Sequence, residues 1–292
     1  MRIAVATPTG HIGSRVVQKL IAAKTDVTVL ARKPESLPED VRSKTRVAQG
    51  ALDDGAFVQR ATEGIDTLFW LTPPNFAAPD PRAFMVGLAE NAAAAIRKNH
   101  IQRVVNVSSH GAGLPGLGPV EWLGSVEKIL DGAAANTVHL RAGVFMENLL
   151  QQIPMLKQGM VVDPADPAIA MPWVATRDIA DVAANWLLDG TWTGHRVVAV
   201  SGPRDLRFAD VVSALSSALG KAVTHKRASF DDVRDNFLRR GASPAVAEAY
   251  RGMVATFQSG TVKEEPRTPE STTPTTLEQF AREVIQPMVE RS

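Results

Sequence analysis

The order of patterns near the N-terminus constrains this chain more than any other feature. Residues 2–6 form a short apolar run of the kind found in buried parallel strands. A glycine-containing turn at 7–13 follows, apolar residues then recur at helical spacing from Ile12 to Ile21, and a second apolar run occupies 27–31. A strand, a helix and a strand within about 30 residues make one βαβ unit, whose two strands are parallel.

The same alternation continues to about residue 150. Further strands are expected at 45–47, 66–71, 104–108 and 137–141, with helices at about 81–98 and 120–134. Strands that alternate with helices predict a parallel, doubly wound α/β sheet with right-handed crossovers. We therefore expect a Rossmann-type fold for this part of the chain.

The pattern changes after about residue 150, where residues 151–176 are mixed in character and contain four prolines. Beyond them we expect a helix at 176–188, a strand at 196–200, an amphipathic helix at 208–219, a helical pair within 231–257, an extended loop at 263–276 and a last helix at about 277–289. Residues 1–150 are thus expected to form the Rossmann domain, joined by a returning strand and helix near 195–220. Residues 151–292 are expected to form a smaller C-terminal α/β lobe.

The turn at 7–13 is suited to hold the phosphates of a dinucleotide. It places the N-terminus of a helix, with its free backbone N–H groups and its dipole, directly after a strand. Gly10 would let the backbone approach the phosphates and Gly13 would let the helix pack on the strand, while Thr7 occupies the place of the usual first glycine. We assign the phosphates to Thr7, Thr9, Gly10, His11, Ile12 and Gly13. The alternative is a purely structural turn of another α/β fold.

The residues after the second strand indicate which dinucleotide binds. An acid that binds the ribose of NAD would stand there, and this chain instead has Arg32 and Lys33. The planar fork of an arginine suits a 2′-phosphate. NADP(H) is therefore favoured over NAD(H), the alternative being a solvated basic turn.

Ligands of open α/β sheets bind outside the carboxyl ends of the strands. At the other strand ends we assign cofactor contacts to Asp53, Thr72, Pro73, Pro74, Ser108 and Gly143. Thr72-Pro73-Pro74 is equally explained as a strand stop, and Ser108 as a cap of the Gly-rich loop that follows it. Candidate residues for an acceptor pocket are Asn75, Phe76, Phe145, Asn148 and Trp173, although each aromatic could simply belong to the core.

With these residues in view, the chain resembles the NmrA-like group of atypical short-chain dehydrogenase/reductase proteins. The matching segments are Val5 to Gly13, Leu52 to Asp54, Asp66 to Pro74, Val105 to Ser109, Leu140 to Asn148 and Asp178 to Ala183. The resemblance implies an NAD(P)-binding fold with a small lobe that closes over the nicotinamide end. It also implies one of two functions: an NADPH-dependent reductase of quinones, dyes and similar acceptors, or a redox sensor that binds the dinucleotide and a regulatory protein without turnover.

The usual proton-transfer pair of short-chain dehydrogenases, a tyrosine with a lysine four residues later, is absent. The one tyrosine is Tyr250, and Val254 stands four residues on. Hydride transfer to a quinone needs orientation and a dry pocket more than an enzymic acid. We therefore expect a reductase that transfers hydride directly to a quinone-like acceptor, with a sensor as the alternative, and we assign no catalytic residue. His110 and Glu127 are possible polar contacts without an assigned role.

Composition excludes several other classes of function. The net charge of +1 argues against a nucleic-acid partner, and no apolar run approaches the length of a membrane span. The chain has no cysteine, its six histidines lack the spacing of metal ligands, and residues 1–23 do not resemble a signal peptide. We expect a cytoplasmic protein without a metal, whose partner is a small-molecule acceptor or a regulatory protein. Its oligomeric state is left open.

Overall fold

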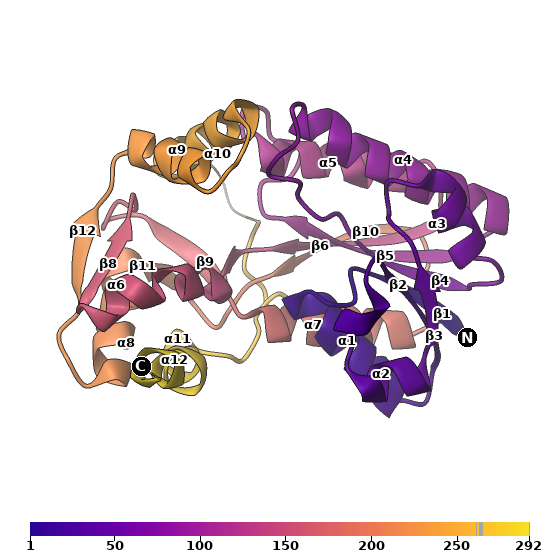
Figure 1. Ribbon diagram of the computed structural model, residues 1–292, viewed down its shortest axis with the longest axis horizontal. Coiled ribbons are helices and arrows are strands. Elements are labelled where there is room, and N and C mark those ends of the chain that lie inside the picture. The colour runs from indigo at the N-terminus through magenta and orange to yellow at the C-terminus, as the bar shows by residue number, and fades with distance from the viewer. Residues whose placement is uncertain (261, 263–264, 292) are drawn as a thin grey trace.

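A seven-stranded parallel sheet forms the larger part of the molecule (Figure 1). The computed structural model describes residues 1–260, 262 and 265–291. The strands are β1 (Arg2–Ala6), β2 (Asp26–Ala31), β3 (Arg46–Gln49), β4 (Thr67–Leu71), β5 (Arg103–Ser109), β6 (Asn136–Ala142) and β10 (His195–Val200). Their order is β10-β6-β5-β4-β1-β2-β3, and every neighbouring pair is parallel. The predicted Rossmann-type α/β fold is confirmed.

Helices cover both faces of this sheet, which explains why a strand such as β1 is buried and apolar on both sides from Ile3 to Ala6. α1 (His11–Ala22), α2 (Glu39–Lys44) and α7 (Thr176–Leu188) lie on one face, and α3 (Gly55–Ala61), α4 (Pro81–Asn99) and α5 (Pro119–Asp131) on the other (Figure 1). Successive side chains of a strand point to opposite faces. In β1, accordingly, Ile3 and Val5 enter the core beneath α1 and α7, whereas Ala4 and Ala6 enter the core beneath α3 and α4.

A smaller lobe follows β6 and has its own core. β7 (Val144–Phe145), β9 (Ala170–Val174) and β11 (Asp205–Arg207) form one sheet, and β8 (Met160–Asp163) pairs with β12 (Thr224–Arg227) in another. The remaining helices of the lobe are η2 (Met146–Gln152), α6 (Ile153–Lys157), α8 (Phe208–Leu219), α9 (Phe230–Arg239), α10 (Pro244–Phe257), α11 (Leu277–Phe280), the π-helical turn η3 (Ala281–Ile285) and α12 (Gln286–Glu290). A short 3₁₀ turn, η1 (Pro34–Ser36), lies in the larger part.

The chain crosses between the two parts more than once. After β9 it returns to the large sheet, where α7 packs on α1 and β10 becomes the edge strand beside β6. The helix expected to return with that strand, α8, instead lies in the lobe, because its apolar face (Val211, Leu215) packs with Leu156 and Phe280 of the lobe core. Five lobe strands have no counterpart in the predicted elements: β7, β8, β9, β11 and β12. Four of them have four residues or fewer, and β9 is interrupted by Pro172, so none gives a periodic signal. Of the expected loop at 263–276, residues 263 and 264 lie outside the described residues.

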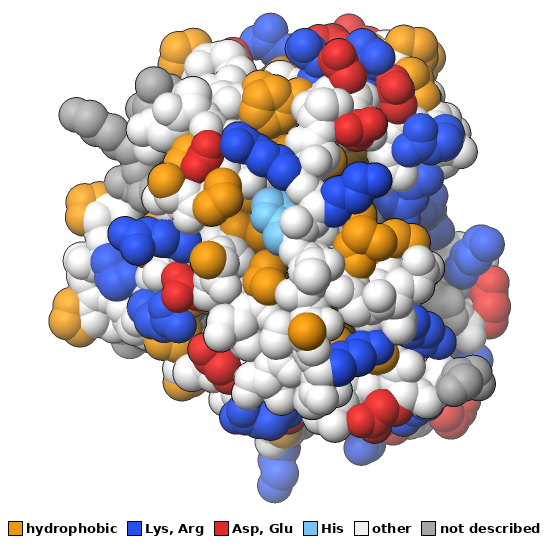
Figure 2. All heavy atoms as spheres, turned by 90° about the vertical axis from the view of Figure 1, so that its left-hand side faces the viewer, with side chains coloured by type: hydrophobic (Ala, Val, Ile, Leu, Met, Phe, Trp, Pro, Cys, Tyr) orange, Lys and Arg blue, Asp and Glu red, His pale blue; other side chains and the backbone are white. Residues whose placement is uncertain are grey.

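Charge on the outer face of the lobe is mixed. Figure 2 shows lysine and arginine side chains interspersed with acidic and hydrophobic ones, without a continuous basic field. None of the helices in the described part of the chain combines the length and apolar character needed to span a bilayer. Nor do the described histidine, aspartate and glutamate side chains form a group of three or more that could hold a metal ion.

Candidate functional site

The turn between β1 and α1 has an unusual backbone at the position where a dinucleotide fold ordinarily has glycine. Thr7 has a φ of +53°, in the left-handed region that glycine adopts without strain. A non-glycine residue in that region costs of order 1–3 kcal/mol. The sharp turn is closed by the Gly10 N–H, which donates to the Thr7 carbonyl at 3.2 Å. Thr7 therefore performs the backbone role of the missing glycine.

Two glycines of this turn face different surroundings. A Cβ on Gly13 would lie 2.2 Å from the Thr7 carbonyl oxygen, so only glycine lets α1 approach the turn this closely. A Cβ on Gly10 would meet nothing nearer than that same oxygen at 3.6 Å, which is ordinary contact. Gly13 is thus required for packing, whereas Gly10 borders open space on the side from which a ligand would approach.

The N-terminus of α1 has the properties of an anion site. It has no side-chain cap and no acidic residue in its first turn. The Thr7 hydroxyl is buried and has no hydrogen-bond partner among the described residues. Free N–H groups, a helix dipole and an unpaired buried hydroxyl all fit a pyrophosphate.

Arg32 and Asp53 lie at the same edge of the sheet, after β2 and β3. The Arg32 side chain is exposed, and its guanidinium makes no hydrogen bond or ion pair with any described residue. Asp53 is exposed as well, whereas its neighbour Asp54 caps α3 by accepting from the Phe57 N–H at 3.0 Å. A free guanidinium in this place fits a ribose 2′-phosphate.

The strand ends nearer the centre of the sheet are buried. The Thr72 hydroxyl accepts a hydrogen bond from the Trp70 indole at 2.9 Å, so it is already engaged. Ser108 is only 4% exposed, and its hydroxyl has no hydrogen-bond partner among the described residues. Gly143 has a structural reason to be glycine, because a Cβ there would lie 1.9 Å from the Pro172 carbonyl oxygen. Of these three, Ser108 has the polar group best placed for a ligand.

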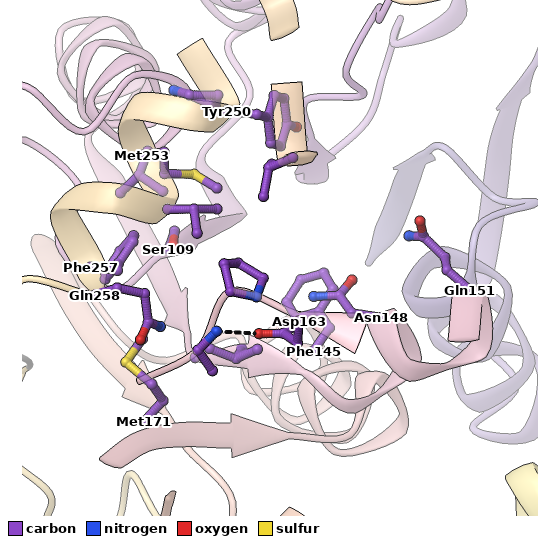
Figure 3. Close-up of a pocket in the computed structure, with 18 of the residues that line it drawn as sticks. Ser109, Phe145, Asn148, Gln151, Asp163, Met171, Tyr250, Met253, Phe257 and Gln258 are labelled. Atoms are coloured by element: carbon purple, nitrogen blue, oxygen red, sulfur yellow. Dashed lines mark hydrogen bonds between the residues drawn. The ribbon is translucent and has the colours of Figure 1, made fainter. Parts of the chain in front are cut away.

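A cavity of about 990 Å³ lies between this edge of the sheet and the lobe. Its sheet side includes Leu71, Thr72, Pro74, Val107, Ser108 and Gly143. The opposite walls come from the lobe, with Met171 and Trp173 on one side and Tyr250, Met253 and Phe257 of α10 on another (Figure 3). Large apolar walls with a few polar groups are typical of sites for small molecules.

The predicted acceptor residues divide into two groups. Phe145, Asn148 and Trp173 line the cavity. Asn75 and Phe76 do not line it, because the loop after β4 turns outward to meet the helical pair. There Phe76, although 45% exposed, packs its ring against Phe237 and Tyr250, each with a centroid distance of 5.8 Å.

The helices α9 and α10 form a wall of the cavity that the sequence did not predict. The N-cap of α10, Ser243, is anchored on the loop after β4: its N–H donates to the Phe76 carbonyl at 2.8 Å and its hydroxyl to the Ala78 carbonyl at 2.6 Å. This contact brings Tyr250 into the cavity, where burial raises the pKa of its hydroxyl. Val254 lines the cavity beside it, so no lysine stands at the position that a Tyr-Lys pair would need.

Two residues of the segment Leu140 to Asn148, Arg141 and Glu147, connect the elements around the edge of the cavity. Arg141 pairs with Glu127 at 2.7 Å and with Glu265 at 2.8 Å, and these carboxylates, Glu127 foremost, raise the pKa of its guanidinium. His110 contacts Glu265 at 3.2 Å. Glu147 accepts from the N–H and hydroxyl of Thr176 at the start of α7. The polar groups His110 and Glu127 therefore belong to a structural network.

Comparison with known proteins agrees with this architecture. A model of the NmrA-like family matches residues 1–281. The NAD(P)H azoreductase of Xenophilus azovorans is 29% identical over 259 residues, which make up 87% of this chain and 86% of that protein. The triphenylmethane reductase of Citrobacter sp., solved with NADP(H), has a TM-score of 0.81 at 17% identity and covers 97% of this chain and 99% of its own.

A third protein extends the comparison. The NADPH-dependent quinone oxidoreductase of Escherichia coli, solved with NADPH, has a TM-score of 0.73 at 19% identity, with 96% of this chain and 98% of that chain covered. The two structural likenesses show a shared fold, and the family model covers nearly the whole chain. The resemblance drawn from the sequence segments is confirmed, and this protein belongs to the NmrA-like family.

Proposed function

We propose that this protein is an NADPH-dependent reductase that transfers hydride directly to a conjugated small-molecule acceptor, of the quinone or azo type. The observation that carries the proposal is the large apolar cavity at the carboxyl edge of the sheet, next to the unpaired Ser108 hydroxyl. Its volume of about 990 Å³ is ample for a flat aromatic acceptor beside a nicotinamide ring. NADPH supplies the hydride when bound.

The residues at the two ends of the site would divide the work of binding. The turn at Thr7–Gly13 would hold the phosphates, and Arg32 the 2′-phosphate that distinguishes NADPH from NADH. Phe145, Asn148 and Trp173 would orient the acceptor. Because reaction rates depend steeply on alignment, orientation in a dry pocket can supply much of the rate.

The names of the similar proteins support this acceptor class. They describe an azoreductase, a triphenylmethane reductase and a quinone oxidoreductase, all of which reduce conjugated aromatic or quinonoid compounds. Their shared fold and the apolar cavity here favour the same general chemistry, while the physiological acceptor is a matter for experiment.

The test is NADPH oxidation with a panel of one quinone, one azo dye and one cationic triarylmethane dye, with NADH run in parallel. Steady turnover on at least one acceptor, faster with NADPH, is the expected result. Tight NADPH binding without turnover on any acceptor would instead support a redox sensor that regulates a partner protein.

A further inference from the structure

One carboxyl group faces the acceptor cavity without a complete set of partners. It belongs to Asp163, the last residue of β8, which lines the cavity together with Phe145 and Asn148 (Figure 3). Its Oδ1 accepts a hydrogen bond from the Ala165 N–H at 2.9 Å. Its Oδ2 makes no hydrogen bond or ion pair with any described residue. One oxygen is therefore available to a ligand.

The surroundings of Asp163 favour the protonated carboxylic acid. Burial raises its pKa, and this effect outweighs the hydrogen bond from Ala165 and the charge of His225, which act in the opposite direction. The other charged residues nearby are on β12 and the following turn. Of these, Lys226 and Arg227 also line the cavity, but both are exposed to solvent, and Arg227 pairs with Asp166 at 3.1 Å. A general acid works best when its pKa lies near the working pH, and burial moves Asp163 in that direction.

The other titratable groups of the cavity wall are less suited to give a proton. Burial moves the pKa of Tyr250 away from neutrality. Both ring nitrogens of His110 are engaged, one with Ser201 and one with Glu265, each at 3.2 Å. Asp232 accepts hydrogen bonds from the N–H and hydroxyl of Ser229, which lower its pKa. Asp163 is the carboxyl of the wall with both a raised pKa and a free oxygen.

We propose that Asp163 is the general acid that protonates the acceptor as it is reduced, and that it equips the site for acceptors whose reduced form is strongly basic, such as azo compounds. The proposal rests on the reductase function proposed above. One nitrogen of the N=N bond receives the hydride, the π electron pair moves to the other nitrogen, and that nitrogen takes the proton of Asp163. The product is the hydrazo compound, and the carboxylate regains its proton from water.

An azo compound, a quinone and a triarylmethane cation differ in their need for an acid, because hydride addition leaves atoms of different basicity. Addition of hydride to an azo group leaves a strongly basic nitrogen anion, so proton transfer is needed in the same step. A quinone leaves a phenolate-like oxygen, which is a much weaker base. A triarylmethane cation becomes neutral on taking the hydride and needs no proton. The change in the ratio of rates on these acceptors when the acid is removed therefore reports on the proton transfer.

The test compares the wild type with Asp163→Asn, which keeps an oxygen to accept from Ala165 and so preserves the turn. General acid catalysis contributes about 100-fold or more, so the ratio of kcat on the azo dye to kcat on the cationic dye should fall by about 100-fold. The corresponding quinone ratio should fall less. Asp189→Asn is the matched control, since Asp189 makes a similar turn with Thr191 but does not line the cavity, and both ratios should stay unchanged. Asp163→Ser, which also keeps an acceptor oxygen, replaces the first variant if that one unfolds.

A second readout needs no turnover. The difference between carboxyl NMR titrations of ligand-free wild type and Asp163→Asn should reveal one group titrating above the usual aspartate pKa of about 4. Titration at or below that value would overturn the proposal. Equal losses on all three acceptors, or an unchanged azo rate, would overturn it while leaving the reductase function intact. Absence of wild-type turnover on every acceptor would overturn both.

Discussion

The phosphate end and the acceptor end of this site are built in opposite ways. The proposed phosphate end lies within one local segment, residues 7–13, with Arg32 directly after the next strand, β2. The acceptor end is assembled from segments far apart in the sequence: Ser108 from the large sheet, Asp163 and Trp173 from the lobe, and Tyr250 from α10. A short local motif is enough to hold a cofactor, whereas the pocket for the acceptor is shaped by the packing of a separate lobe. We therefore expect mutations that change the choice of cofactor and mutations that change the choice of acceptor to fall on different parts of the molecule.

The largest effect is expected where packing is tightest. Gly13→Ala would place a methyl group 2.2 Å from the Thr7 carbonyl oxygen and push α1 off the turn. Overpacking of this kind costs up to about 3 kcal/mol of folding stability. Because it also displaces the helix N-terminus that would hold the phosphates, NADPH affinity should fall by about 100-fold in a fluorescence titration. Gly10→Ala is the matched control and should bind with a much smaller loss, because its Cβ has ordinary contacts. Equal losses in the two variants would mean that the turn is not built as described.

Asn148→Ala tests whether the acceptor end can be changed without changing NADPH binding. Asn148 lines the cavity, and misplacing an acceptor by ~1 Å can cost about 100-fold in rate, so kcat should fall by up to about 100-fold while the NADPH Kd stays unchanged. Asn75→Ala is the matched control: the same side chain, at the same edge of the sheet, outside the cavity. A loss of NADPH affinity in Asn148→Ala would show that the two ends are not separable.

Arg32→Ala should affect the choice of dinucleotide and little else. An exposed charge-assisted hydrogen bond is worth about 1.5 kcal/mol, so NADPH affinity should fall by about 10-fold while NADH affinity stays the same. Lys33→Ala, its neighbour, should leave the preference nearly intact. If wild-type affinities for NADPH and NADH prove equal, the assignment of Arg32 is wrong.

Tyr250→Phe should have the smallest effect, despite its place in the cavity wall. No lysine accompanies the tyrosine, and its raised pKa makes it a poor proton donor near neutrality. Turnover should change by less than about 10-fold, which corresponds to 1.4 kcal/mol. A larger loss with the melting temperature and NADPH affinity intact would assign the proton transfer to Tyr250 and contradict the direct-hydride mechanism without a tyrosine.

The sequence predicted the fold and the position of the glycine turn between β1 and α1, because both depend on local patterns. The apolar runs of β1 and β2, the helical spacing of α1 and the glycines between them all fall within one βαβ unit. The position of Arg32 followed from the end of the second strand. The positive φ of Thr7 could not be foreseen, since a β-branched residue rarely adopts that conformation.

Only part of the acceptor cavity could be predicted in this way: Phe145, Asn148 and Trp173 line it as expected, whereas its other walls could not be foreseen. Tyr250 reaches the cavity because Ser243 docks on a loop 165 residues earlier, and no local pattern encodes such a contact. Asp163 ends a short strand, β8, that gives no periodic signal. The place of Phe76 after a strand favours a pocket residue, yet its ring packs outside the cavity against Phe237 of α9 and Tyr250 of α10. Residues within one local pattern could be assigned from the sequence, whereas contacts between distant segments could not.

Direct passage of hydride from NADPH to an acceptor in this cavity can be tested by an isotope experiment. A cationic triarylmethane dye is reduced in ordinary water with NADPH that carries deuterium at both C4 positions of the nicotinamide, and then with ordinary NADPH in D₂O. The central carbon of the product does not exchange with solvent, so it records the origin of its hydrogen. Direct transfer predicts deuterium at that carbon in the first experiment and none in the second. Deuterium from the solvent, or tight NADPH binding with no reduction of the dye or any other acceptor, would contradict the account.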